Sequence, residues 1–312
     1  MAIMAGFTAV LLYMGACFAF AWFSINPRRL TYSQVLEKEI RRNHLDPQLA
    51  NLPFTAVYCP APGGGRLMGR LYQNPGDQRS ISTGKYVLFF HGYNAPWASG
   101  LKYLPLLWRL GFHVLMAEQP GHGESSGRFI TYGAREAKAG LVWLSWLEGQ
   151  QGASLAETVV MGESMGAATA LLTAAACPQI GFCIADCSYS SWREELLYQG
   201  KKRYGPLAAA LIPGVGLWCR LLTGVSFSDV EPAAAARNIQ CPVLLFHGDA
   251  DTVVPVAMAQ KIAEANPAAK LHIVKGAAHA NAIAQAPEEY GAAVEAFLGL
   301  RGACFFKEKV GV

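Results

Sequence analysis

A five-residue pattern, Gly162-Glu163-Ser164-Met165-Gly166, lies between an apolar strand-like run and an alanine-rich helical run. A serine on a strained turn from strand to helix needs neighbours without Cβ atoms, because the backbones approach closely there. The N-terminus of the following helix also favours negative charge that develops nearby. The pattern therefore predicts that Ser164 is a nucleophile; the alternative is a glycine-rich turn that carries an incidental serine.

A serine hydroxyl is a weak nucleophile near neutral pH, so it needs a base within hydrogen-bond reach. Three histidines follow Ser164 in the sequence. His247 ends a strand-like run, and His272 lies within another, where we expect it to face the sheet. His279 lies in the loop after the last strand-like run, which places it at the carboxyl edge of a parallel sheet. We therefore predict that His279 is the base.

The carboxylate that orients this base is expected in the loop after the run PVLLFH, which contains Asp249 and Asp251. Asp249 comes two residues after the strand and could instead brace the loop by accepting hydrogen bonds from backbone amides. Asp251 reaches further toward the histidine. We predict that Asp251 is the acid, with Asp249 as the alternative.

Attack by a serine on an acyl carbon creates an oxyanion, which needs two backbone N–H donors already in place. Met165, directly after the nucleophile, is the first predicted donor. The second comes from the loop after the run YVLFF, where His91, Gly92 and Tyr93 follow one another, and we predict Tyr93. His91 and Gly92 are expected to shape this turn.

Six apolar runs of strand length alternate with longer stretches of helical pattern. Each run is almost continuously apolar, as expected of strands buried on both faces of a parallel sheet with crossover helices between them. Residues 55–59 and 67–72 flank three glycines and predict a hairpin ahead of this sheet. The sequence thus indicates an α/β fold with a mostly parallel sheet and helices on both faces. The six runs begin at Tyr86, Phe112, Thr158, Phe182, Pro242 and Leu271.

The helical stretches include one connection that is longer than a crossover needs. It contains two segments, residues 192–204 and 207–222, separated by Gly205 and Pro206. We interpret the region of about residues 188–240 as a small helical cap inserted over the sheet edge; a plain long crossover is the alternative. The other expected helices cover residues 98–110, 132–148, 165–176, 256–265 and 287–300.

Residues 3–25 contain no charged side chain, and this run is long enough to cross a hydrocarbon core as a helix. It ends abruptly at Pro27, and Arg28 and Arg29 follow. We predict a single transmembrane helix. A cleaved signal peptide is the alternative, but no basic region precedes the run, which also exceeds the usual apolar core of a signal. Lipoprotein-type cleavage before Cys17 fits the preceding residues poorly.

Basic residues gather on one side of this predicted span. Lys38, Arg41 and Arg42 follow the two arginines, so the positive-inside rule predicts a cytoplasmic domain. Much of the formal net charge of +4 lies here, which suits anionic lipid headgroups better than nucleic acid. The further cluster at residues 201–203 is interpreted as a solvated helix face, and no nucleic-acid partner is expected.

The eight cysteines are scattered and contain no C-x-x-C pair, which argues against a zinc site or a disulfide framework. We expect buried free thiols, a reducing compartment, and neither a metal nor a cofactor.

Five motifs together resemble the α/β-hydrolase superfamily, and more narrowly its prolyl-oligopeptidase-like branch of membrane-anchored esterases and peptidases. They are HGYNAP, QPGHGESSG, GESMGAATAL, HGDADTVVP and GAAHA, within a resemblance that covers about residues 54–300. It implies Ser164 as nucleophile, Asp251 as acid, His279 as base, and Tyr93 and Met165 as oxyanion donors. His122 matches a position that is generally structural in such proteins. The lipase-type motif HGGG is missing, which weakens assignment to that group.

The expected organisation is a transmembrane anchor at residues 1–27, a juxtamembrane helix and linker at 28–53, and an α/β-hydrolase domain at 54–302. The expected reaction is hydrolysis of a carboxylic ester or thioester through an acyl-enzyme, and membrane tethering favours a lipid-like acyl substrate. Two alternatives stay open: a peptidase for small peptides, and a membrane-anchored binding protein without turnover. The oligomeric state is left open by the sequence.

Overall fold

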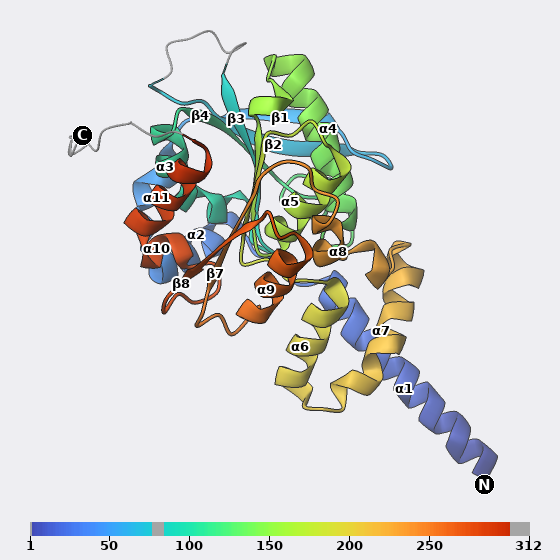
Figure 1. Cartoon of the computed structure of the whole chain (residues 1–312). Helices are drawn as coiled ribbons and strands as arrows, with labels where there is room; N and C mark the ends of the chain where they lie inside the picture. The colour runs from blue at the N-terminus through green and yellow to red at the C-terminus, as the bar shows by residue number, and fades with distance from the viewer. Residues whose placement is uncertain (1, 77–83, 300–312) are drawn as a thin grey trace.

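The computed structural model describes residues 2–76 and 84–299 and is built around an eight-stranded sheet (Figure 1). The strand order is β1-β2-β4-β3-β5-β6-β7-β8. β1 pairs antiparallel with β2, and β2 with β4, whereas the pairs from β4 to β8 are parallel. The strands are β1 (Thr55–Pro60), β2 (Arg66–Tyr72), β3 (Lys85–Phe90), β4 (Phe112–Ala117), β5 (Val159–Glu163), β6 (Phe182–Asp186), β7 (Val243–Gly248) and β8 (Lys270–Val274).

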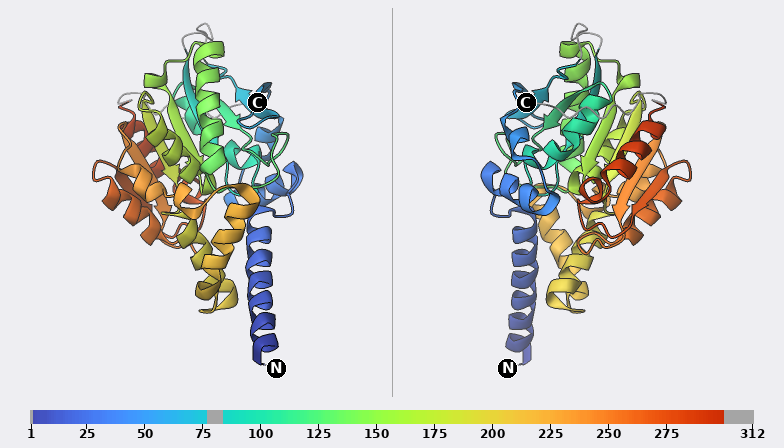
Figure 2. Two further views of the ribbon diagram at one scale, coloured as in Figure 1. Left: turned by 90° about the vertical axis from the view of Figure 1, so that its right-hand side faces the viewer. Right: turned by 90° about the vertical axis from the view of Figure 1, so that its left-hand side faces the viewer.

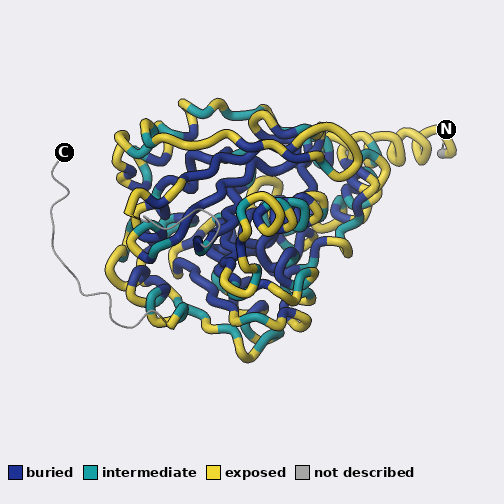
Figure 3. Tube along the Cα trace, turned by 90° about the horizontal axis from the view of Figure 1, so that it is seen from above, coloured by how far each residue is buried: buried dark blue, intermediate teal, exposed yellow. Residues whose placement is uncertain are grey.

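The predicted hairpin and all six predicted strands are present. β4 to β7 are buried almost throughout, as their continuous apolar runs indicate (Figure 3). β8 differs, since Lys270 and Ile273 are exposed and only Val274 is buried. The reason is its place at the edge of the sheet, where β7 is its neighbour on one side.

Helices cover both faces of the sheet, as expected for this fold class. α4, α5, α8 and α9 lie on one face, and α2, α3, α10 and α11 on the other, each set sharing an apolar core with the strands (Figure 1). The bounds are α2 (Tyr32–Asn43), α3 (Leu104–Arg109), α4 (Ala134–Gln151), α5 (Met165–Ala176), α8 (Pro232–Ala236), α9 (Val256–Ala265), α10 (Ala282–Gln285) and α11 (Pro287–Phe297).

Two helices start later than the sequence pattern predicts. The helix expected over residues 98–110 is a 3₁₀ helix at Trp97–Tyr103 followed by α3, because Pro105 has no N–H and is accepted only in the first turn of an α-helix. The helix expected from residue 132 begins at Ala134, since Tyr132 (φ 54°) and Gly133 (φ 120°) are outside the helical region. The expected ends at residues 300 and 302 lie outside the described residues.

A third group of helices lies beyond the carboxyl edge of the sheet. α6 (Trp192–Tyr204) and α7 (Ala208–Thr223) form an antiparallel pair, here called the cap hairpin, and α1 (Ala2–Ile25) packs against it (Figure 2). The Tyr13 hydroxyl donates to the carbonyl of Ala210 (2.9 Å), and Trp218 Nε1 donates to the carbonyl of Met14 (3.1 Å). The N-terminal half of α1 projects away from the rest of the protein.

The segment Ile3–Ile25 is long and apolar enough to cross a membrane, and a signal sequence shares these properties of length and composition. The segment after it is part of the globular body. Val35 of α2 is fully buried in the apolar core, and Glu39 and Asn43 are buried beside it. α2 therefore fixes the chain that leaves α1 to the domain that carries the site.

Candidate active site

Ser164 occupies a strained backbone position between β5 and α5, with φ 55° and ψ −116°. Its N–H donates to the carbonyl of Asp186 (2.8 Å), which holds the turn against β6. A Cβ on Gly162 would lie 2.1 Å from the Gly166 carbonyl oxygen, and one on Gly166 would lie 2.0 Å from the Phe90 oxygen. Both glycines are therefore required for the close approach that exposes the serine.

The structure brings Ser164, His279 and Asp251 together. His279 Nε2 lies 2.9 Å from Ser164 Oγ, and His279 Nδ1 lies 2.7 Å from Asp251 Oδ2. With the Nδ1 proton donated to the carboxylate, Nε2 is free to accept the serine proton. The three side chains come from loops after β5, β7 and β8, which end at the same edge of the sheet.

The two candidate carboxylates have different partners. Asp251 is buried, and its Oδ1 accepts from the backbone N–H groups of Val253 (2.8 Å) and Val254 (2.9 Å). Burial alone would raise its pKa, but hydrogen bonds from His247 and His279 lower the pKa well below its usual value. Asp251 therefore stays ionised. The exposed Asp249 accepts from the N–H of Gly276 (2.6 Å), so it braces the loop.

The other two downstream histidines have other partners. His247 is buried, and its Nε2 lies 2.8 Å from the carbonyl of Val254 and 3.4 Å from Asp251 Oδ2. It thus supports the acid rather than contacting the serine. His272 lies on the partly exposed edge strand, where its Nε2 is 2.7 Å from Glu289.

The two predicted oxyanion donors belong to segments that adjoin the nucleophile. Met165 is the first residue of α5, and Tyr93 follows Gly92, whose added Cβ would be 3.6 Å from Ser164 Cβ. The Tyr93 hydroxyl donates to the carbonyl of Ser24 in α1 (2.7 Å). The last turn of α1 therefore holds the loop that contains the second candidate donor.

Two buried histidines also fix this loop. His91 Nε2 accepts from the N–H of Gln119 (3.1 Å), and His122 Nε2 accepts from the N–H of Asn94 (3.1 Å). Burial lowers the pKa of His91 to about 4 and that of His122 well below its ordinary value. Both rings are therefore neutral at pH 7, which allows Nε2 to accept in each case.

A buried ionic cluster lies beneath the nucleophile. Lys102 Nζ is 2.6 Å from Glu163 and 3.0 Å from Glu39, and the Tyr103 hydroxyl oxygen lies 2.9 Å from a carboxylate oxygen of both Glu163 and Asp186. Burial alone lowers the pKa of Lys102, but the two carboxylates raise it more. Burial raises the pKa of Glu163, opposed by Lys102. The cluster connects α2 to the residue that precedes Ser164.

α2 and the 3₁₀ helix that contains Lys102 also support the loop that carries the base. Arg42 Nη2 donates to the carbonyl of His279 (2.6 Å), and Lys102 donates to the carbonyl of Ala280 (3.1 Å). The amide of Asn281 donates to Asn43 (2.8 Å). Ala280 has φ 56°, an uncommon value for a residue with a side chain, and these contacts hold the chain there.

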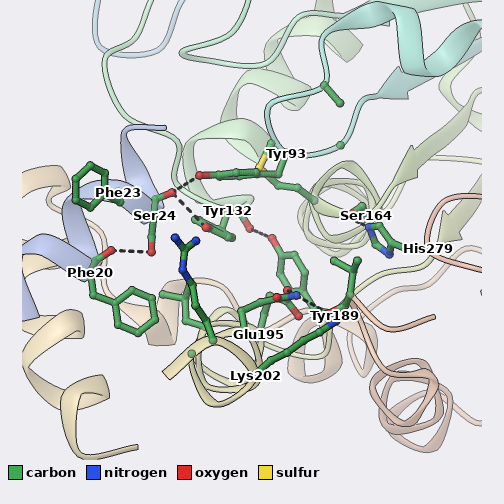
Figure 4. A pocket seen from close by; sticks show the side chains of 18 of the residues that line it. Phe20, Phe23, Ser24, Tyr93, Tyr132, Ser164, Tyr189, Glu195, Lys202 and His279 are labelled. Carbon is green, nitrogen blue, oxygen red and sulfur yellow. Dashed lines mark hydrogen bonds between the residues drawn. The ribbon is translucent and has the colours of Figure 1, made fainter. Parts of the chain in front are cut away.

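A cavity of about 1030 Å³ opens above Ser164 and His279. Figure 4 places Phe20 and Phe23 of α1 at one end of it and the serine and histidine at the other. Glu195 of the cap hairpin is buried in its lining, and burial raises its pKa from the ordinary value of 4.5 to about 7. The cavity therefore joins a mostly apolar wall to a polar floor.

Cys187 lies close to the site. Its sulfur, a carboxylate oxygen of Asp251 and a ring nitrogen of His279 lie within 4.8 Å of one another, a spacing that could hold a metal ion. Burial raises the pKa of the Cys187 thiol well above its ordinary value, so the sulfur stays protonated. The imidazole and the carboxylate are hydrogen-bonded to each other, and the other ring nitrogen of His279 lies 2.9 Å from Ser164 Oγ.

Several residues of the site gave no signal in the sequence beyond their charge. Arg42 belonged only to a juxtamembrane basic group, and Lys102 stands alone in an apolar stretch. Glu195 lies in a helix with charged residues on either side of it. A single charge amid apolar residues, as at Lys102, is the one pattern that points to a buried partner. The seven cysteines in the described ranges are free, five of them buried, and Cys304 lies outside those ranges.

Fold and site define an α/β hydrolase, and the chain belongs to the alpha/beta hydrolase family, whose model matches residues 87–293. The chain is 28% identical over 275 residues to YqkD, an uncharacterized protein of Bacillus subtilis (strain 168), covering 87% of this chain and 88% of that protein. The narrower resemblance to a prolyl-oligopeptidase-like branch stays a prediction.

Solved structures of an esterase and of peptidases share the fold. The Pyrococcus furiosus esterase Pf2001 superimposes with a TM-score of 0.66 at 23% identity, covering 88% of this chain and 98% of the esterase. The Pyrococcus horikoshii acylaminoacyl peptidase gives 0.58 at 14% identity, covering 83% of this chain and 43% of the peptidase. A Mycobacterium tuberculosis puromycin-hydrolyzing peptidase gives 0.56 at 19% identity, with coverage of 83% and 40%.

Proposed function

We propose that this protein is a serine hydrolase that cleaves a carboxylic ester or thioester through an acyl-enzyme. The observation that carries the proposal is the chain of hydrogen bonds from Ser164 through His279 to Asp251 (2.9 and 2.7 Å) on the floor of the cavity. This arrangement has the three parts that nucleophilic catalysis by serine requires: nucleophile, base and orienting carboxylate.

The proposed reaction has two halves. Ser164 Oγ attacks the acyl carbon while His279 Nε2 takes its proton, and the N–H groups of Tyr93 and Met165 stabilise the oxyanion. His279 then returns the proton to the leaving alcohol or thiol. Water, deprotonated by His279, attacks the acyl-enzyme, and the acid and free serine are released. Asp251 stays ionised and stabilises the imidazolium.

A fluorophosphonate probe together with p-nitrophenyl esters tests this proposal. We expect the probe to label the full-length protein and Ser164→Ala to abolish both labelling and ester hydrolysis. Ser228→Ala, at an exposed serine, is the matched control and should leave both unchanged. Equal labelling of wild type and Ser164→Ala would contradict the assignment, and no labelling with no turnover would favour a binding role.

The peptidase alternative is weaker, because this chain spans less than half the length of either peptidase that it resembles in fold. The residues that line the cavity are also mostly apolar, which suits an acyl chain. Parallel assays with p-nitrophenyl esters and aminoacyl p-nitroanilides separate the two. We expect a higher kcat/KM for the esters; the reverse would favour the peptidase.

We further propose that α1 is retained as a membrane anchor and that the domain lies on the cytoplasmic side. Retention is supported by the bonds of its last turn, where the Ser24 carbonyl accepts from Tyr93. Arg28, Lys38 and Arg41 are exposed beyond that turn, which supports the orientation. Protease treatment of intact cells should leave the domain whole. Degradation there, or a mature protein that begins after residue 25, would overturn this proposal.

A further inference from the structure

One wall of the cavity is made by the apolar helix that is proposed to cross the membrane. Ala16, Ala19, Phe20 and Phe23 of α1 line it, opposite residues of the cap hairpin. If α1 crosses a bilayer, these side chains lie at the depth of the hydrocarbon or its border, because lipid surrounds a span on every side that protein does not cover. A cavity with such a wall therefore meets lipid.

The cap hairpin lies alongside the half of α1 that is nearest to the domain. The rings of Phe20 and Tyr204 have centroids 5.8 Å apart, and the hydroxyl of Tyr13 reaches the carbonyl of Ala210. At 1.5 Å per residue, Phe20 and Tyr13 lie about 8 and 18 Å from the end of α1 at Ile25. The tip of the hairpin thus reaches about as deep as the cytoplasmic half of a hydrocarbon core of roughly 30 Å.

The exposed side chains of the cap hairpin are of the types expected at this depth in a membrane. Leu207 at its tip is 77% exposed, and Leu221 is 64% exposed on α7. Lys201, Lys202 and Arg203 lie one turn before the tip, close to the level of Phe20. Lys202 Nζ donates to the carbonyl of Thr252 (2.7 Å), and the side chains of Lys201 and Arg203 are exposed. Exposed basic side chains at that level can extend to anionic headgroups, while leucine at the tip can contact acyl chains.

The cavity has the size and polarity for an acyl chain. Its volume of about 1030 Å³ is at the upper end of what small-molecule pockets enclose, roughly 300–1,000 Å³. Apolar side chains of α1 and α7, including Leu211, lie on the membrane side, and the polar floor holds Ser164 and His279. A long apolar chain can therefore lie along the wall while its ester carbonyl reaches the serine.

We propose that the cavity is a lateral entrance through which long-chain acyl esters pass from the bilayer to Ser164. The entrance lies between α1 and the cap hairpin, whose tip is immersed in the cytoplasmic leaflet. This inference rests on the proposed function, because it names the substrate class of that same site. The exposed side chains of Lys201 and Arg203 hold the hairpin at the headgroup level.

The first experiment narrows the entrance in the full-length protein, reconstituted in phosphatidylcholine–phosphatidylglycerol vesicles. Ala19→Trp places a large ring in the wall, and Ala9→Trp is its control on an exposed part of α1 outside the cavity. We expect the ratio of kcat/KM for p-nitrophenyl palmitate to that for p-nitrophenyl acetate to fall at least about tenfold in Ala19→Trp. An unchanged ratio, or an equal fall in Ala9→Trp, would overturn the inference.

The second experiment leaves the wall intact. p-Benzoylphenylalanine in place of Leu207 is irradiated in vesicles that contain an alkyne-tagged phosphatidylcholine, and the same residue replaces the exposed Glu288 of α11 as a control. Lipid adducts at position 207 but not at 288 are expected. Their absence at 207 would overturn the immersion of the hairpin. Loss of fluorophosphonate labelling and of all ester turnover in the wild type would instead remove the proposed function.

Discussion

Ser164, His279 and Asp251 lie on loops that leave the same edge of the sheet, after β5, β8 and β7. The opposite wall of the cavity comes from α1 and the cap hairpin. The floor is polar, and its side chains and loops are hydrogen-bonded to backbone and to buried ions. The wall is mainly apolar and is made by helices that lie outside the sheet. Under the two proposals made above, the floor determines which bond is attacked, and the wall determines which molecule reaches it.

The sharpest test of the floor is its carboxylate. Asp251→Asn keeps the size of the side chain but removes the acceptor charge that fixes the His279 tautomer, so we expect kcat for a p-nitrophenyl ester to fall on the order of 10⁴-fold. Asp249→Asn is the matched control, since the Asp249 carboxylate accepts from the N–H of Gly276, and it should change kcat far less. The opposite ranking would assign the acid to Asp249.

The next largest effect is on stability, at the turn between β5 and α5 that contains Ser164, here called the elbow. The Cβ of Gly162→Ala would lie 2.1 Å from a backbone oxygen that cannot move without displacing α5, so we expect a loss of about 3 kcal/mol in the free energy of unfolding. Gly149→Ala in the exposed part of α4 meets nothing within 4 Å and should gain up to about 1 kcal/mol. Thermal denaturation measures both. Equal melting temperatures would contradict the close approach at the elbow.

Glu195 lies where floor and wall meet, and it predicts a pH dependence. Its folded-state pKa of about 7 exceeds the ordinary 4.5, so the folded protein binds more protons between these values. Wild-type stability should therefore fall as pH rises from about 4.5 to 7, by roughly 3 kcal/mol from this group. Asp251 and His247 face it; Asp251 strengthens the shift, and His247 opposes it.

Glu195→Gln removes that titration while keeping the hydrogen-bonding shape. The variant should gain stability relative to wild type as pH rises from 5 to 8, measured by urea denaturation at each pH. Identical pH profiles for the two proteins would show that folding does not raise the pKa of Glu195.

The sequence predicted the floor far better than the wall. The triad could be located because each residue follows an apolar strand, and strand ends in a parallel sheet meet at one edge. The supporting contacts could not, because Arg42 and Lys102 reach the His279 loop from segments distant in sequence. The predicted starts of two helices were wrong where the conformation of a single residue sets the start, as at Tyr132 and Pro105.

The cavity wall could not be predicted from the sequence for a related reason. Residues 3–25 predicted a membrane span from composition alone, which says nothing about which of its faces would contact protein. The face of α1 that contacts protein is set by small residues. An added Cβ at Gly214 of α7 would lie 2.4 Å from Cys17 Sγ of α1, so α1 and α7 pack closely. The packing of α1 against α7 depends on how both helices fold onto the domain. Neither the hydrophobic periodicity nor a sequence motif predicts it.

The smallest predicted effect lies in the wall, at Phe23. This side chain is 72% exposed and lines the cavity, so Phe23→Ala should weaken contact with a long acyl chain by about 1 kcal/mol, and less with acetate. We expect the ratio of kcat/KM for palmitate and acetate esters to fall about fivefold. Phe7→Ala, at an exposed residue of α1 outside the cavity, should leave the ratio unchanged. If both substitutions reduce the ratio equally, α1 acts only as an anchor, and the division between a floor that reacts and a wall that selects would fail at this helix.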